Sequence, residues 1–404
     1  GREMIKRYFK RLKTEFKGYN AGKFGKDVLA GITVAAVALP LALAFGISSG
    51  ATAAAGLITA LIAGVVIGLL SGASYQISGP TGAMAAILCS LVATYQIQGV
   101  FIACFMSGVI LLLCGIFKLG GLVQFIPTPV ITGFTSGIAI IIAFGQINNL
   151  TGLKCEGAST IDKIVSYFNM PQTLNFEAIA IGVCVIVFML IYPKKLNAII
   201  PSSLMSIIIA TALNFIFNFN VGIVGEIPQT LLLNDRLDIT AIDFDTVKNL
   251  IFPAISIAAL GLIESLLCGA SAGRMKNEKL DSDQELVAQG IGNMLIPFFG
   301  GVPATAAIAR TSVAIKSGAQ TRIAGVIHSL VLLASMFLLG GALLAGISGL
   351  LKSYCNVNEV ISGIMLNWIT LYAMNDLLTN VKEAASPYTC LLYTSPSPRD
   401  RQKS

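Results

Sequence analysis

The stretches QISGPTGAM (residues 76–84) and FGGVPATAAIARTSVAIKSG (residues 299–318) interrupt two apolar runs at corresponding places in the two halves of this sequence. Each combines glycine with proline, so we expect one helix to stop there and another to start just after the proline. The N-terminus of a helix has free N–H groups and a partial positive charge, so two facing helix starts form a site for an anion. Paired interruptions of this kind are typical of the binding site of a secondary transporter.

The composition is that of an integral membrane protein. Of 404 residues, 55% are hydrophobic and 12% are charged, with a mean hydropathy of +0.80. A soluble domain usually carries about 25% charged residues. The net charge of +7 gathers in residues 1–26, where nine Lys or Arg residues precede the first apolar run. This distribution predicts a cytoplasmic N-terminus facing the headgroups of the cell membrane, and it argues against nucleic acid as a partner.

We expect an all-α chain that crosses the membrane many times. A basic cytoplasmic segment, 1–27, precedes a transmembrane transport domain, 28–340. Two apolar spans, 81–94 and 304–315, directly follow the interruptions and are too short to cross a bilayer as full helices. The sequence predicts about eleven spans, at 28–46, 54–71, 81–94, 99–117, 130–148, 176–192, 199–217, 251–271, 286–299, 304–315 and 323–346.

An internal repeat relates the two interruptions. The separation of Val28 from Pro80 equals that of Ile251 from Pro303, and each pair begins a span and ends in an interruption. An odd number of spans lies between the two starts, so the second unit enters the membrane from the opposite side. Basic residues gather in most of the loops that this topology places inside, as the positive-inside rule requires. We therefore predict an inverted repeat whose broken helices meet near the middle of the membrane.

A few polar residues at membrane depth lie in or near the interruptions. At the first, Gly82 lets the backbone approach a ligand and Thr81 supplies a hydroxyl. At the second, Thr305 supplies a hydroxyl, and Arg310 follows the proline by two helical turns. Because an arginine in a membrane span is costly unless it faces a cavity or a partner, we expect Arg310 beside the bound anion. Glu264, the only acid in its span, is a candidate for binding sodium or carrying a proton.

Structural roles for the same residues are the alternatives. Each interruption could be a packing kink, Arg310 could extend to the inner surface, and Glu264 could form a salt bridge with Arg310. Ser265 is a weaker companion of Glu264. The matched pair of interruptions favours the functional interpretation, because a site between opposed half-helices needs both of them.

Four segments carry a resemblance to a known family. They are VALPLALAFGISSG (37–50), QISGPTGA (76–83), GLIESLL (261–267) and GGVPATAAIARTSVAIKSGAQTRIAGVIHSLVLL (300–333). In combination they resemble the SulP family of inorganic anion transporters, the bacterial relatives of the animal sulfate and anion exchangers. The resemblance covers about residues 20–335.

The resemblance implies a seven-plus-seven inverted-repeat fold shared with uracil permease, in which a core domain moves against a gate domain in an elevator-like cycle. It implies that the anion is held between the third and tenth spans. Arg310 matches the arginine of the family's tenth span. Glu264 matches an acidic position linked to sodium or proton coupling in some members. The residues that would face each other across the anion are Thr81, Gly82 and Ala83 on one side and Ala304, Thr305 and Ala306 on the other.

The sequence also departs from the family. Leu41 stands where many members carry glutamine, and neither the last spans nor the usual cytoplasmic STAS domain is recognisable. Residues 349–375 are similar instead to permease subunits of simple-sugar or nucleoside ABC importers. Residues 386–404 have no domain character and resemble translated sequencing adaptor. Our hypothesis is a chimeric reading frame, with an unrelated segment at 341–385, a non-native tail at 386–404, and a SulP domain truncated to about eleven spans.

The sequence thus predicts a secondary active transporter for a small inorganic anion such as sulfate or bicarbonate, coupled to Na+ or H+ and using no other cofactor. An enzyme is not expected, because no nucleophile–base pair is visible. A metal site is not expected either, since His328 is the only histidine and the eight cysteines form no CxxC pair. The alternatives are a nucleobase carrier of the same fold, a passive anion channel, or an ABC permease subunit. A homodimer is left open.

Overall fold

The structure is a computed structural model that describes residues 2–121, 147–151, 174–193 and 230–338 except 239, 241 and 242, with isolated positions between 133 and 217. Its elements are α1 (Arg2–Glu15), α2 (Ala21–Ser48), α3 (Ala53–Leu70), β1 (Ser78–Gly79), α4 (Gly82–Ile116), α6 (Ile147–Thr151), α8 (Phe176–Ile191), α11 (Phe244–Lys276), α12 (Ser282–Leu295), a 3-10 helix η3 (Ile296–Phe299), β2 (Thr305–Ala306), α13 (Ile308–Lys316) and α14 (Ile323–Leu338).

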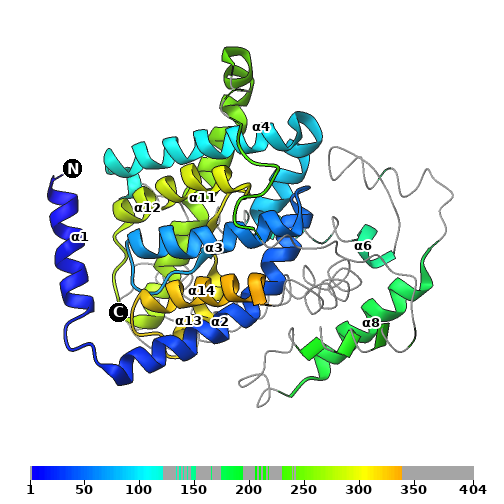
Figure 1. Ribbon diagram of the computed structural model, residues 1–404, viewed down its shortest axis with the longest axis horizontal. Coiled ribbons are helices and arrows are strands. Elements are labelled where there is room, and N and C mark those ends of the chain that lie inside the picture. Colours follow the sequence, from blue (N-terminus) through cyan, green and yellow to red (C-terminus); the bar gives the residue numbers. More distant parts are fainter. Residues whose placement is uncertain are drawn as a thin grey trace, which may run out of the picture.

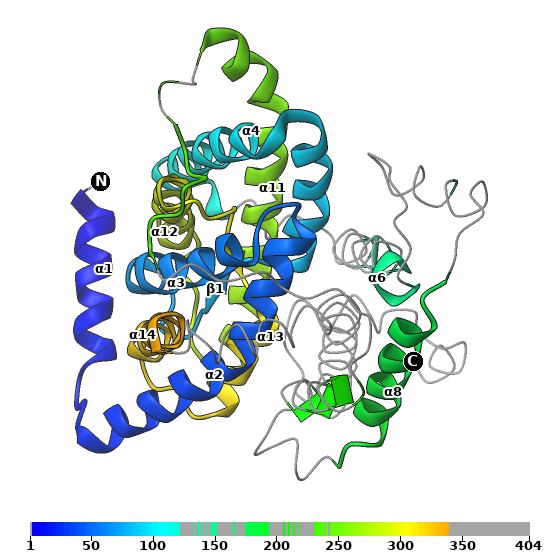
Figure 2. The same cartoon turned by 45° about the vertical axis from the view of Figure 1, so that its right-hand side comes forward.

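Most of these helices form one bundle. From top to bottom in Figure 1 the order is α4, α12, α3 and α14, and each packs against the next. α2 lies against α3 and α14, and α11 crosses the same bundle beside α4 (Figure 2). Small residues allow the close approach, because a Cβ atom added to Gly290 of α12 would lie 2.5 Å from the backbone nitrogen of Leu112 in α4. α6 and α8 lie to one side, away from α1 (Figure 1).

Four of the described helices, α2, α3, α4 and α11, are long and apolar enough to cross a membrane. α4 contains the predicted spans 81–94 and 99–117, which are separated by a kink at Gln96, where φ is 59°. Most of the predicted spans 130–148 and 199–217 lie outside the described residues. The segments at 341–385 and 386–404, and with them the chimera hypothesis, also lie outside the described part.

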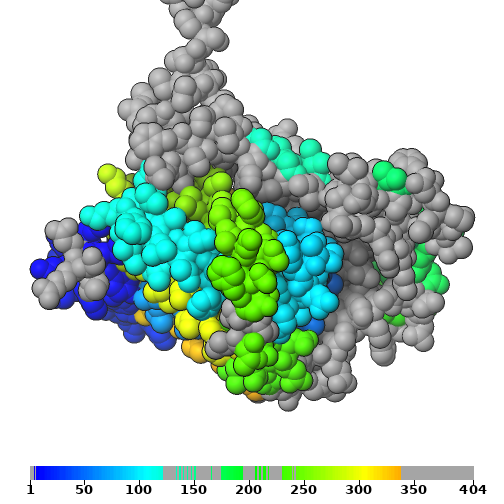
Figure 3. Space-filling view, turned by 90° about the horizontal axis from the view of Figure 1, so that it is seen from above, coloured from blue at the N-terminus to red at the C-terminus, as the bar shows by residue number. Residues whose placement is uncertain are grey.

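Large apolar side chains cover the outside of the bundle. On α11, Phe244 is 83% exposed and Phe252 is 79% exposed. The space-filling view shows α4 and the first part of α11 side by side (Figure 3). Exposed apolar side chains are what lipid contact requires of a membrane domain.

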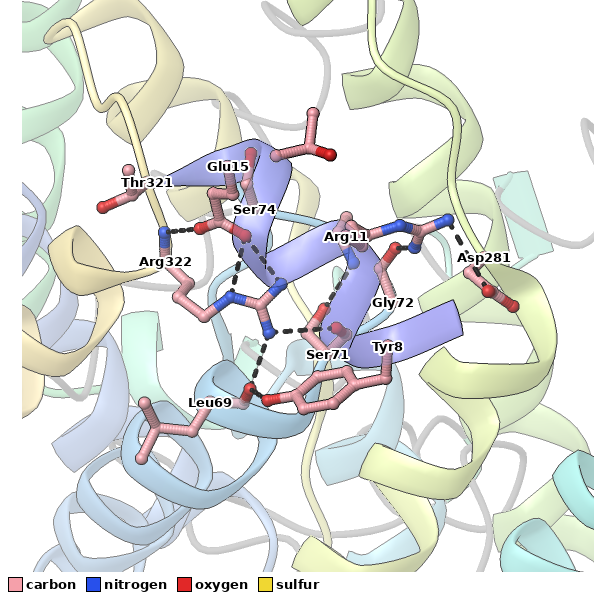
Figure 4. A network of polar contacts seen from close by, with 12 residues as sticks. Tyr8, Arg11, Glu15, Leu69, Ser71, Gly72, Ser74, Asp281, Thr321 and Arg322 are labelled. Atoms are coloured by element: carbon pink, nitrogen blue, oxygen red, sulfur yellow. Dashed lines mark hydrogen bonds and ion pairs between the residues drawn. The ribbon is translucent and has the colours of Figure 1, made fainter. Parts of the chain in front are cut away.

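α1 crosses the ends of α3 and α14 and is fixed there by a buried ion pair (Figures 1 and 4). The Arg322 guanidinium donates to the Glu15 carboxylate at 2.8 and 3.0 Å, and the backbone N–H of Arg322 donates to the same carboxylate at 2.8 Å. Arg322 also donates to the Leu69 carbonyl at 2.6 Å, where α3 ends. The remaining contacts are Tyr8 to the Leu69 carbonyl, and Arg11 to the Gly72 carbonyl and to Asp281.

Candidate functional site

At the first interruption the chain leaves α3, passes through the short strand β1 and enters α4. Thr81 is the N-cap of α4, and its hydroxyl oxygen accepts from the backbone N–H of Met84 at 3.4 Å. Gly82 and Ala83 form the first turn. The helix starts just after Pro80, as predicted, and the capping hydroxyl of Thr81 fixes its first residue at Gly82.

At the second interruption the helix starts later than predicted. α13 begins at Ile308, so Ala304 lies outside it, and Thr305 and Ala306 form the strand β2 and not the first turn of a helix. The reason is that β2 pairs with β1 in an antiparallel sheet, with Ser78 opposite Ala306 and Gly79 opposite Thr305. The N-cap of α13 is Ala307, which offers no side-chain cap.

The strand pair brings the predicted residues of both interruptions to one carboxylate. Oε2 of Glu264 accepts from the Thr305 hydroxyl at 2.7 Å and from the Thr81 hydroxyl at 2.9 Å. The two hydroxyl oxygens are 3.3 Å apart. Next to Glu264, the Ser265 hydroxyl accepts from the backbone N–H of Ala306 at 3.2 Å. The acid predicted for cation coupling and the threonines predicted for anion binding therefore belong to one site.

Arg310 also lies near this site, but it is not two helical turns beyond Pro303, as the spacing predicted. It is the third residue of α13, since the residues between Pro303 and Ile308 are not helical. Its side chain is fully buried, and Nη2 donates to the Pro80 carbonyl at 2.6 Å. A Cβ atom on Gly79 would lie 2.5 Å from Nη1, so a larger residue at this position would displace the guanidinium. Among the described residues the ion pairs are Arg11–Asp281 and Glu15–Arg322, so the alternative Glu264–Arg310 salt bridge is not formed.

Sequence reasoning missed the residues that hold the second interruption in place. The Thr59 hydroxyl, on α3, accepts from the Val302 N–H at 2.8 Å and lies 2.9 Å from the Val302 carbonyl oxygen. The Asn293 amide, on α12, bonds both the N–H (2.8 Å) and the carbonyl (2.9 Å) of Ala304. A usable signal was present, because Gln289 and Asn293 stand four residues apart in an otherwise apolar predicted span.

Chemically, the site has positive and negative features side by side. The N-termini of α4 and α13 and the Arg310 guanidinium favour an anion. The Glu264 carboxylate, within hydrogen-bond distance of both threonine hydroxyls, opposes an anion unless it carries a proton or pairs with a cation. Within the described residues no group of three His, Cys, Asp or Glu side chains is arranged to hold a metal ion.

Comparison with known proteins gives one consistent family. The Sulfate permease family matches residues 24–348. The chain is 42% identical over 335 residues to the "Putative sulfate transporter YvdB" of Bacillus subtilis (strain 168), which covers 80% of this chain and 62% of that protein. It is 32% identical over 335 residues to the Bicarbonate transporter BicA of Picosynechococcus sp., which covers 78% of this chain and 57% of that protein. The chain thus spans about three-fifths of the length of these relatives.

Among solved structures, the fold is similar to the transmembrane domain of a cyanobacterial bicarbonate transporter, BicA. The TM-score is 0.78 at 27% identity, over 93% of this chain and 94% of that chain. This similarity confirms the predicted all-helical membrane fold with an inverted repeat. The relatives are transporters and not enzymes. By the extent of the match and the identity to its relatives, the chain belongs to the Sulfate permease (SulP) family of membrane transporters.

Proposed function

We propose that this protein is a secondary active transporter of a small inorganic oxyanion, with sulfate and bicarbonate as the leading substrates. The two named relatives are described as transporters of these anions. Both are small and compact and carry several oxygen acceptors, so backbone N–H groups can bind either one. In this proposal the chain is a multi-pass protein of the cell membrane with a cytoplasmic N-terminus, and the choice between a monomer and a homodimer is left open.

The observation that carries the proposal is the convergence of both interruptions on Glu264. In the proposed site the anion lies between the first turn of α4 and the β2–α13 junction. Arg310 supplies the positive charge, although its guanidinium also bonds Pro80. The proposed anion-binding residues are Thr81, Gly82, Ala83, Ala304, Thr305, Ala306 and Arg310.

The coupling ion would bind at Glu264, with Ser265 as its neighbour. A carboxylate that accepts two hydroxyl hydrogen bonds at 2.7 and 2.9 Å is placed to bind Na+ or a proton. Either ion would neutralise the Glu264 carboxylate, which otherwise repels the anion. The coupling ion and the anion would therefore bind together. Coupling then follows if the doubly occupied and empty forms prefer different states of an elevator-type cycle.

One observation favours a second candidate, a nucleobase carrier of the same fold. Such a carrier needs an acid or an amide to read the edge of a base, and Glu264 lies beside both threonines. The relatives described as sulfate and bicarbonate transporters make the anion the stronger proposal. Competition of uracil with labelled anion tests this alternative directly.

The experiment is uptake of labelled sulfate and labelled bicarbonate by liposomes, with and without a sodium or proton gradient. Two proteins are compared: the chain itself, and a version in which the C-terminal region of the Bacillus relative replaces residues 349–404. We expect gradient-dependent uptake and counterflow of one of the two anions. Gradient-independent flux without counterflow would indicate a channel, and uptake of uracil in place of either anion would indicate the nucleobase carrier.

A further inference from the structure

A row of polar side chains runs along one face of α12. Glu285, Gln289 and Asn293 stand four residues apart, so they share a face of the helix. Relative exposures of 0%, 0% and 2% show that all three are buried. Buried polar side chains in a membrane domain are costly, so each is expected to have a hydrogen-bond partner or a function.

The two ends of the row contact segments from both halves of the repeat. At one end, the Glu285 carboxylate accepts from the Ser71 hydroxyl at 2.6 Å and from the Gly72 N–H at 3.0 Å, at the end of α3 and before the first interruption. At the other end, the Asn293 amide bonds the backbone of Ala304 in the second interruption. One rigid helix therefore fixes segments from both halves of the repeat.

Gln289 joins the row to the strand pair. Its Nε2 donates to Oε1 of Glu285 at 2.9 Å and to the Ser78 hydroxyl at 3.0 Å. Ser78 is in β1, opposite Ala306 in β2. Because the Glu285 carboxylate only accepts, it orients the Gln289 amide so that the NH2 group faces Ser78.

This orientation leaves a cost. Oε1 of Gln289 is buried and has no hydrogen-bond partner in the described part of the chain. A buried acceptor without a donor destabilises the fold. The stabilising contribution of the amide lies in its NH2 group, which satisfies the Glu285 carboxylate and ties Ser78 of β1 to α12.

We infer that Gln289, oriented by Glu285, is a positioning residue for the anion site, and that it acts by holding Ser78 so that β1 and β2 set the distance between the two interruptions. The inference rests on the proposed transport function. Within the described part of the chain Gln289 makes no hydrogen bond to Thr81, Thr305 or Glu264, so its effect passes through the strand pair.

The test replaces Gln289 by methionine and uses Gln284→Met as the matched control. Gln284 is a buried glutamine on the same helix that donates to the Leu70 carbonyl at 2.8 Å, away from the strand pair. For Gln289→Met we expect a lower melting temperature, because Oε1 of Glu285 loses its donor, together with a rise in KM for the transported anion of about tenfold, the effect of losing a hydrogen bond of about 1.4 kcal/mol. For Gln284→Met we expect an unchanged KM.

Two further measurements separate the outcomes. Ser78→Ala should raise KM as much as Gln289→Met, and the double variant should be no worse than either single one, because both remove the same contact. Hydrogen exchange of the backbone at 77–81 and 304–307 should be faster in Gln289→Met and unchanged in Gln284→Met, a readout that does not depend on transport. An unchanged KM and unchanged exchange in Gln289→Met would overturn the inference. Absence of uptake by the wild-type chain would instead overturn the proposed function, and the exchange data would still decide this inference.

Discussion

The two interruptions occupy equivalent places in the repeat, yet they end in different ways. The first ends in α4, whose N-terminus is capped by the Thr81 hydroxyl. The second continues as an extended strand to Ala306 and ends in α13, which has no side-chain cap. Arg310, from the second, bonds the Pro80 carbonyl of the first. The two halves of an inverted repeat can therefore share a topology and still differ in detail. The first half provides a capped helix N-terminus, and the second provides an uncapped helix N-terminus and the positive charge of Arg310.

We expect the largest mutational effect at Arg310, which bonds the Pro80 carbonyl of the opposite interruption. Arg310→Ala removes the bond to the Pro80 carbonyl and the positive charge, so we expect anion uptake to fall about a hundredfold, as for truncation of a buried charged partner. The measurement is initial uptake in liposomes, normalised to the amount of reconstituted protein. Arg274→Ala, on the exposed last turn of α11, is the control. Uptake of Arg310→Ala at the wild-type rate would remove this residue from the site.

Glu264 is the point where both interruptions meet, and its charge can be removed with little change in shape. Glu264→Gln keeps an oxygen that accepts from both threonines but loses the carboxylate charge, so the protein should fold normally. We expect uptake to fall about tenfold or more, the worth of a hydrogen-bonded charge, and the remaining uptake to become independent of the sodium or proton gradient. Coupling that persists in this variant would place the coupling ion elsewhere.

Thr81 is both a helix cap and a hydrogen-bond donor to Glu264. Comparison with Thr52, which caps another helix, separates these two roles. Thr52 caps α3 by accepting from the Ala55 N–H at 3.1 Å and has no part in the site. Thr81→Ala and Thr52→Ala should each lower the free energy of unfolding by about 1 kcal/mol. Only Thr81→Ala should raise KM, by about fivefold to tenfold, because it also removes the hydroxyl that donates to Glu264. Equal KM values in the two variants would mean that Thr81 acts only as a cap.

The smallest expected effect concerns the uncapped N-terminus of α13. Ala307→Ser supplies an oxygen to the free N–H groups of α13, so the free energy of unfolding should rise by about 1 kcal/mol. The same oxygen would compete with the anion for these N–H groups, and we expect KM to rise about threefold, a change of roughly half a hydrogen bond. The melting temperature and KM are measured on one preparation. A stabilised variant with an unchanged KM would show that the start of α13 does not bind the anion.

Much of the architecture could be predicted because it depends on local chemistry. Apolar length predicted the spans that α2, α3 and α11 form, and the equal separations around Pro80 and Pro303 predicted the repeat. The choice of Thr81, Thr305 and Glu264 required only the rule that polar side chains in a membrane are costly. The structure places these three within hydrogen-bond distance of one another.

The register of the second interruption could not be predicted. Whether the residues after Pro303 form a helix or a strand depends on the partner strand, which is more than 200 positions away along the chain. A propensity argument sees alanines at 304, 306 and 307 and favours a helix, but the hydrogen bonds with Ser78 and Gly79 outweigh it. The hydrogen bond from Thr59 to Val302 was missed for the same reason, since its partner is a backbone group that the sequence does not reveal. Asn293 was marked by its place in an apolar predicted span, but its backbone partner, Ala304, was not.

The buried ion pair between Glu15 and Arg322 also has a practical consequence. It joins α1 to the loop before α14, and Arg322 also contacts the end of α3 through the Leu69 carbonyl. In the proposed elevator-type cycle, a displacement of the bundle would move α1 with it. A spin label or fluorophore on the exposed Lys13, paired with one on another part of the molecule, would therefore test for this displacement without altering the proposed anion site.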